Sequence, residues 1–236
     1  MKIFCCALGS LLLSAVACGQ DANPAVSGSA KTPTAAEVID RIKSHAGIPW
    51  MSETVDTFKS GDPQSPLTGI AVTMMATLDV LERAAANKQN LIITHEPTFY
   101  DHQDKASEVP AGESDQVLAE KRAFIEKNHL IVWRFHDHWH RMKVDGIEAG
   151  NVRVLGWEKY QDPSNPYRFT IPEITIEKLA DELQTKLGIS VIRVVGDRKM
   201  KVTRVAMSPG AAGAKREIAA LEEPEVQVLL AGETRE

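Results

Sequence analysis

Cysteine is nearly absent from this 236-residue sequence, and its three copies, Cys5, Cys6 and Cys18, all lie in the first eighteen residues. The rest of the chain therefore has no pair of thiols that could form a disulfide bond. It also lacks the thiolates of a Cys-ligated zinc site and a cysteine nucleophile. Any metal site in the body of the protein must be built from histidine nitrogens, carboxylate oxygens and water.

Long apolar runs and an excess of basic charge are absent as well. No apolar run reaches the ~20 residues that cross a bilayer as a helix, which excludes a polytopic membrane protein. The chain has 27 basic and 32 acidic side chains, a net charge of −5, so we expect no nucleic-acid partner. A hydrophobic content of 43% with 25% charged residues is typical of a globular protein.

The first residues have the pattern of an export signal. A lysine and an apolar run lead to Ala15-Val16-Ala17, a small-residue cleavage pattern directly before Cys18. We expect residues 1–17 to be a signal peptide, and the segment also resembles a bacterial lipoprotein signal. Acylation of Cys18 would then anchor an envelope lipoprotein to the membrane, and cleavage without lipid would give a periplasmic protein. The alternative is an apolar N-terminal helix in a cytoplasmic protein.

Residues 18–34 are small and polar and contain proline, which predicts a flexible tether. Beyond them, helical and strand patterns alternate, which is typical of βαβ units with a mostly parallel sheet. Thr34 and Ser114 are the expected N-caps of two of the helices. In this first part we predict helices at 35–45, 77–86 and 115–128, and strands at 69–73, 91–94 and 131–135.

A second α/β group follows a turn-rich segment at 161–166, which contains two prolines and is the best internal boundary. The prediction is thus an α/β fold of two intermeshed lobes, 35–160 with a metal site and 167–236, whose sheets are flanked by helices. The last strand lies so near Glu236 that no helix follows to cover it, so we expect the second lobe to be incomplete. Its predicted helices are 175–187 and 214–221, and its predicted strands are 168–173, 190–195, 202–207 and 226–231.

Histidine is concentrated in one segment: six of the seven lie between positions 95 and 140. His95 and Glu96 leave one predicted strand, and His136, Asp137, His138 and His140 leave the next. A helix between two parallel strands returns the chain, so both groups emerge at the same sheet edge, where open α/β sheets bind ligands. The alternative is a solvated histidine loop. His45, His102 and His129 are interpreted as surface or capping residues.

Imidazole and carboxylate ligands suit zinc, manganese, iron, cobalt or nickel, and such a site holds one or two divalent ions. Metal-assisted hydrolysis of a small-molecule substrate is the natural reaction class. A non-catalytic metal-handling protein and a structural envelope lipoprotein are the alternatives. Separately, the loop 208–213 follows a strand and opens a helix, so its amides could hold an anion, although a plain tight turn explains it as well.

Two motifs carry a resemblance to a known family. The segment 69–100, which ends in LIITHEP, resembles the strand–helix–strand segment with an I-I-T-H-H-P motif of the Nif-three-like dinuclear metal family, also called GTP cyclohydrolase type 2-like proteins. HDHWH after IVWRF resembles its later H-x-x-x-D motif, and LLAGE resembles its I-T-G-D strand. The resemblance covers residues 35–236.

The resemblance implies roles for particular residues. His95 matches the first metal-binding histidine, Glu96 stands where the family has a second, and His140 stands where it has a ligand aspartate. Glu233 matches the acidic residue of the glycine-acid pair. Further candidates for metal ligands or for residues that orient the ligands are His136, Asp137, His138 and Glu233.

The closing G-H-x-x-x-E motif of the family is missing, because no histidine follows position 140. The resemblance therefore implies a divergent and C-terminally truncated member. It also implies a homo-oligomer, and a cytosolic location that conflicts with the export signal.

Overall fold

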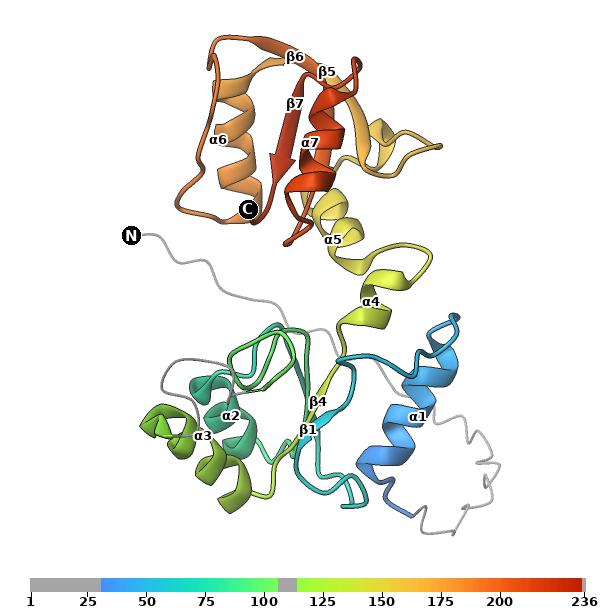
Figure 1. Ribbon diagram of the computed structural model, residues 1–236, viewed down its shortest axis with the longest axis vertical. Coiled ribbons are helices and arrows are strands. Elements are labelled where there is room, and N and C mark those ends of the chain that lie inside the picture. Colours follow the sequence, from blue (N-terminus) through green and yellow to red (C-terminus); the bar gives the residue numbers. More distant parts are fainter. Residues whose placement is uncertain (1–30, 106–113, 235–236) are drawn as a thin grey trace, which may run out of the picture. The chain divides into compact units, whose positions relative to one another are not determined.

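Two mixed sheets organise the part of the chain that the computed structural model describes, residues 31–105 and 114–234 (Figure 1). In the first, with strand order β1-β4-β3-β2, the pairs β2–β3 and β3–β4 are parallel and β1 is antiparallel to β4. The second has the order β5-β6-β7, antiparallel and then parallel. The α/β class is confirmed. The strands of the first sheet are β1 (Phe58–Ser60), β2 (Ile70–Thr73), β3 (Leu91–Thr94) and β4 (Ile131–Arg134).

Helices cover both faces of the first sheet: α1 (Ala35–His45) lies on one side, and α2 (Leu78–Ala86) and α3 (Gln116–Lys127) lie on the other (Figure 1). Successive side chains of a strand point to opposite faces. Leu91 and Ile93 accordingly pack in the cluster of Ile39 from α1, while Ile92 packs in the cluster of Leu81 from α2. This explains why β3 and β4 are apolar without alternation.

Short polar side chains set the starts of these helices. Thr34 caps α1 in a reciprocal capping box with Glu37, as predicted. The predicted cap of α3, Ser114, is wrong by one residue, because the Asp115 carboxylate accepts the N–H groups of Val117 and Leu118. A carboxylate there also interacts favourably with the positive end of the helix dipole.

The second sheet contains β5 (Arg168–Thr175), β6 (Lys201–Ser208) and β7 (Val228–Ala231). The helices α6 (Ile176–Leu187) and α7 (Ala214–Glu222) flank it, and α6 ends at Gly188 in the left-handed conformation, as predicted. Its core cluster includes Phe169, Leu179 and Val205.

The strand predicted at 190–195 is wrong. This segment has no sheet partner among the described residues, although Ile192 and Val194 pack against the core while Val191 and Val195 are 79% and 89% exposed. Its β-branched side chains favour an extended backbone. A strand also needs hydrogen bonds to a neighbouring strand, and this segment belongs to neither sheet of the described residues.

The connection between the sheets consists of α4 (Asp137–Arg141), α5 (Gly146–Leu155) and a 3-10 turn at Glu158–Tyr160. Val152 and Leu155 of α5 pack in the core of the second sheet. Contacts to that core therefore begin before the turn at 161–166, where the sequence places the boundary between 35–160 and 167–236. The boundary itself stays a prediction.

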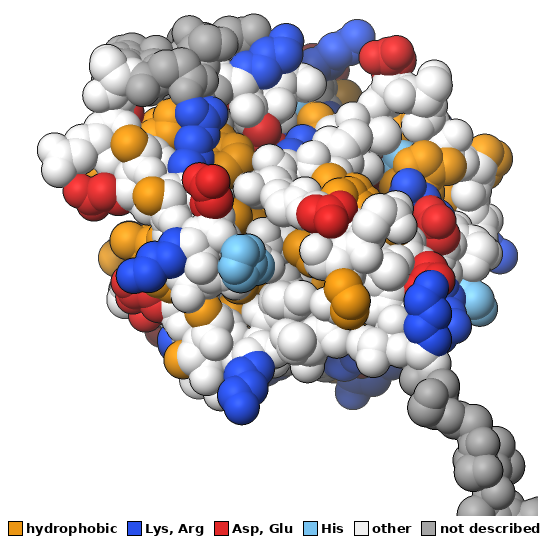
Figure 2. Space-filling model, turned by 90° about the horizontal axis from the view of Figure 1, so that it is seen from below, with side chains coloured by type: hydrophobic (Ala, Val, Ile, Leu, Met, Phe, Trp, Pro, Cys, Tyr) orange, Lys and Arg blue, Asp and Glu red, His pale blue; other side chains and the backbone are white. Residues whose placement is uncertain are grey.

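The expected signal peptide, residues 1–17, and most of the expected tether, 18–34, lie outside the described residues. Within 31–105 and 114–234, every helix is too short or too polar to span a bilayer. Figure 2 shows one face of the molecule, on which Lys and Arg side chains are interspersed with Asp and Glu and hydrophobic side chains form small groups.

Candidate metal centre

The paired strands β3 and β4 bring the two histidine segments together. Their register places Thr94 opposite Arg134, so His95 and the residues after Arg134 leave the sheet at the same edge. The Phe135 N–H donates to the Thr94 carbonyl and continues this pairing by one residue. The chain then turns into α4, where His136 and His140 are four residues apart and share one helix face.

Three imidazoles converge at this edge. His95, His136 and His140 each offer a nitrogen, and these three atoms lie within 4.8 Å of one another. The ring centroids of His95 and His136 are 4.7 Å apart, and those of His136 and His140 are 4.8 Å apart. The Nε2 atoms of His95 and His140 are 3.2 Å apart.

Hydrogen bonds donated by the other ring nitrogens orient two of these rings. The His95 Nδ1–H donates to the Phe135 carbonyl at 3.1 Å, and the His140 Nδ1–H donates to the Asp145 carboxylate at 2.8 Å. These protons on Nδ1 leave the Nε2 lone pairs for a cation. A carboxylate or carbonyl behind the histidine is the usual arrangement around a metal-ligating imidazole.

The donor set fits a divalent transition metal. Two nitrogens at about 2.0–2.1 Å from a tetrahedral zinc ion are about 3.3–3.4 Å apart. The 3.2 Å between the Nε2 atoms of His95 and His140 is close to that value. Two unprotonated nitrogens at this separation repel one another unless a cation or a proton lies between them. A proton shared by the two nitrogens or a metal ion bound by both relieves this repulsion, and the distance between them is compatible with a metal ion.

The pKa values of the three histidines are displaced in different directions. Burial, with the neighbouring His136 and His140, lowers the pKa of His95, and burial also lowers that of His136. The hydrogen bond to Asp145 raises the pKa of His140. At neutral pH, His95 and His136 are thus held in the uncharged form that binds metals.

Asp56, which the sequence analysis missed, positions α4. Its buried carboxylate accepts the N–H groups of His136, Asp137 and His138, so it caps a helix that has no side-chain cap of its own. It also accepts a hydrogen bond from His138 Nδ1 at 2.6 Å. No local motif reveals this contact, because about 80 residues separate the partners.

His138 is in neither three-residue group of possible ligands among the described residues, and a role in orienting the ligands stays a prediction. It is fully buried, its Nδ1 is bonded to Asp56, and its Nε2 accepts the Met51 N–H. Its ring stacks on Trp50 with the centroids 3.5 Å apart. In a helix, residue 138 points away from the face that 136 and 140 share, so the same helical turn that assembles the ligands removes His138.

His102 is exposed, as the sequence analysis expected, and it lies beside the cluster. His102, His136 and Asp137 form a second group whose ligand atoms lie within 4.8 Å of one another. The buried Arg134 holds the loop by donating to the carbonyls of His95 and His102. Arg134 also donates to His102 Nδ1 at 3.4 Å, and that favours a proton on Nε2. This second group is therefore less prepared for a cation than the first.

Three carboxylates are further candidates for the metal site, and their surroundings differ: Asp137, Glu96 and Glu233. Burial alone would raise the pKa of Asp137, but hydrogen bonds from Val55, His136 and Thr54 outweigh it and lower the pKa to about 2. Glu96 is half-buried, and its charge partly counteracts the lowering of the His95 pKa and adds to the raising of the His140 pKa. Glu233 follows β7, where its N–H donates to the Gly210 carbonyl, and neither three-residue group among the described residues includes it.

Comparisons with known proteins identify the family to which the chain is similar. The model of the Duf34/NIF3 (NGG1p interacting factor 3) family matches residues 34–236. A GTP cyclohydrolase 1 type 2 homolog from Clostridium acetobutylicum is 25% identical over 161 residues, which cover 64% of this chain and 58% of that protein. A protein of the same description from Chlamydia muridarum is 26% identical over 182 residues, 73% of this chain and 67% of that protein.

Solved structures show the same fold. A Bacillus cereus protein described as related to NIF3 superposes with a TM-score of 0.68 at 13% identity, covering 87% of this chain and 83% of that one. The residues matched by the family model include both strand-end motifs, LIITHEP and HDHWH. The chain spans only 58% of the Clostridium protein's length.

Proposed function

Because this chain belongs to the Duf34/NIF3 (NGG1p interacting factor 3) family, we propose that it is a divalent-metal-binding protein whose metal centre lies at the ends of β3 and β4. The observation that carries the proposal is the convergence of the His95 and His140 Nε2 atoms, 3.2 Å apart, with a hydrogen-bond acceptor behind each ring. His95, His136 and His140 would hold the first ion.

The carboxylates beside the histidines complete the proposed site. Glu96 and Asp137 add negative charge, which would balance the positive charge of a divalent cation. Asp137 is ionised throughout the neutral range, since its pKa is about 2. His102 with His136 and Asp137 offers donors for a second ion. The candidate metals are zinc, manganese, iron, cobalt and nickel, all of which accept nitrogen and oxygen ligands.

We further propose that the reaction is hydrolysis of a small substrate, of a cyclic or phosphorylated class. A bound divalent ion would supply a Lewis acid and a water of lowered pKa. Around it, Asp145 keeps the proton of His140 on Nδ1, and Asp56 fixes α4. Glu96 is a half-buried carboxylate whose charge acts on both His95 and His140.

Elemental analysis of the purified chain and of His95→Ala and His140→Ala tests the metal proposal. The wild type is expected to retain one or two equivalents of a divalent ion, and both variants are expected to lose them. His45→Ala and His129→Ala are matched controls, because neither histidine is in a candidate metal group of the described residues. Equal metal content in all five proteins would exclude this site.

A hydrolysis assay on phosphate monoesters, phosphodiesters and cyclic amides then separates the two functions. Turnover that requires the metal and disappears in His95→Ala supports the hydrolase. Stoichiometric metal without turnover on any of these substrates favours the alternative, a non-catalytic metal-binding or metal-handling protein.

Export and assembly are separate proposals. We propose from the N-terminal sequence that the chain reaches the cell envelope and is anchored through an acylated Cys18. Mass spectrometry of the mature N-terminus, with Cys18→Ser as the control, tests this, and an intact Met1 in the purified protein would exclude it. Family membership supports a homo-oligomer, which light scattering would detect.

A further inference from the structure

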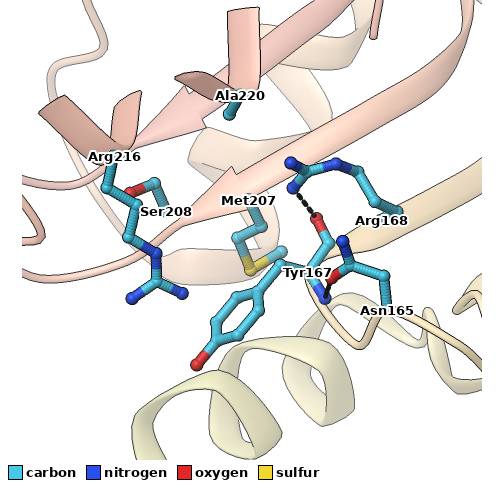
Figure 3. A pocket seen from close by; sticks show the side chains of 7 residues that line it. All are labelled: Asn165, Tyr167, Arg168, Met207, Ser208, Arg216 and Ala220. Atoms are coloured by element: carbon cyan, nitrogen blue, oxygen red, sulfur yellow. Dashed lines mark hydrogen bonds between the residues drawn. The ribbon is translucent and has the colours of Figure 1, made fainter. Parts of the chain in front are cut away.

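A cavity in the second sheet region lies far in sequence from the histidine cluster and is lined by cationic and polar side chains (Figure 3). Its volume is about 130 Å³, several times the ~30 Å³ that one water molecule occupies in the liquid. It lies between the end of β6, the side of α7 and the turn before β5. Its lining residues are Asn165, Tyr167, Arg168, Met207, Ser208, Arg216 and Ala220.

Ser208 supplies the observation that points to a ligand. Its side chain is only 2% exposed, and its Oγ has no hydrogen-bond partner among the described residues. Leaving a buried hydroxyl unpaired costs about 1–3 kcal/mol, so native structures rarely do so. This hydroxyl belongs to a residue that lines the cavity, where a bound group would satisfy it.

Arg216 makes the cavity suitable for an anion. Its guanidinium lies 4.3 Å from the centroid of the Tyr167 ring, and it forms no ion pair among the described residues. Glu148, which is hydrogen-bonded to the Tyr167 hydroxyl, interacts with Arg216 at longer range. Arg168, by contrast, is already neutralised by a bidentate pair with Glu223. Arg216 is thus the lining cation with unused donors.

The remaining contacts favour an oxyanion over an apolar guest. The Asn165 side-chain oxygen accepts the Tyr167 N–H, so its NH₂ group is left to donate (Figure 3). Arg216 lies in the first turn of α7, where the helix dipole adds partial positive charge. A guanidinium, a hydroxyl and an amide are the groups with which proteins bind phosphate oxygens.

We propose that this cavity binds a phosphate group, held by Arg216, Ser208 and Asn165. The group comes either from inorganic phosphate or from a small phosphate monoester, and both have the oxyanion that these donors recognise. The site is independent of the histidine cluster, so the proposal does not require a metal ion.

The test uses chelator-treated full-length protein, at constant ionic strength, with inorganic phosphate and glycerol phosphate as probes. Titration calorimetry is expected to show binding of one equivalent, which is retained in His140→Ala. Arg216→Gln is expected to weaken binding by on the order of tenfold or more, because a charge-assisted hydrogen bond is lost. Arg198→Gln is the matched control, since this arginine is 61% exposed and paired with Glu177.

Ser208→Ala gives a second and opposite readout. Removing an unpaired buried hydroxyl should raise the melting temperature without phosphate and reduce the increase that phosphate produces. A lower dissociation constant for glycerol phosphate than for inorganic phosphate identifies a phosphorylated small molecule as the ligand. The reverse order identifies the free anion. The proposal is overturned if phosphate does not bind the wild type, or if Arg216→Gln binds it as tightly as Arg198→Gln does.

Discussion

The proposed metal centre leads to a specific prediction for Asp145, whose carboxylate both caps a helix and orients His140. One carboxylate oxygen caps α5 by accepting the Ile147 N–H at 2.8 Å, and the other accepts the Nδ1–H of His140 at 2.8 Å. Asparagine caps helices as well as aspartate does, so Asp145→Asn should preserve the cap. Its NH₂ group would instead face His140 Nδ1, which must then accept the hydrogen bond and carry its proton on Nε2. The lone pair offered to a metal is thereby lost.

The expected magnitude follows from this change of tautomer. Losing the residue that orients a metal-ligating histidine typically weakens metal binding by about 10–100-fold, or about 1.4–2.8 kcal/mol. The free energy of unfolding of the metal-free protein should change little. Competition with a chromogenic chelator measures the zinc affinity, and urea unfolding in the presence of chelator measures the stability.

Asp115→Asn is a matched control for Asp145→Asn. Asp115 caps α3 by accepting the N–H groups of residues two and three positions later, as Asp145 does in α5, but it does not contact the histidine cluster. The control should keep wild-type zinc affinity. If Asp145→Asn also binds zinc as tightly as the wild type, the orienting role of Asp145, and with it the lone-pair argument for His140, is refuted.

Three further outcomes follow from the structure. Asp56→Ala should lower the free energy of unfolding by about 3 kcal/mol or more in urea titrations, because it leaves the buried His138 N–H and two part-buried N–H groups without an acceptor; an unchanged midpoint would contradict its capping role. Leu179→Ala should cost about 2–5 kcal/mol, whereas Leu221→Ala, at a 57% exposed site, should stay within about 0.5 kcal/mol, and equal losses would contradict the assigned core. Burial and the charge of Asp145 raise the pKa of Glu148, so the folded state holds the proton of this carboxyl group more tightly than the unfolded state does. The wild type should therefore lose stability relative to Glu148→Gln as the pH rises above 4.5. A stability difference that does not depend on pH would contradict the raised pKa.

Local patterns were sufficient for most helices and for the buried strands of the first sheet. Thr34 begins one helix and Gly188 ends another for reasons that lie within a few residues of chain. The unbroken apolar run of β3 already implies cover on both faces. The α/β class and the common edge of His95 and His140 follow from such patterns together with the handedness of parallel connections.

The roles of individual polar residues required the tertiary structure. Whether the segment after β4 continues as a strand or turns into a helix decides which histidines share a face, and the helix brings His136 and His140 together. Asp56 decides that conformation from some 80 residues away, through hydrogen bonds that no sequence window contains.

The sequence by itself thus determined where donors for a metal gather, because period, capping and strand direction are local properties. Only the tertiary structure decided which donors are free to bind: it engaged both nitrogens of His138 in the core and brought His102 beside the cluster. The physical reason is that a side chain's hydrogen-bond partners depend on distant backbone, whereas its place on a helix or strand depends on its neighbours along the chain.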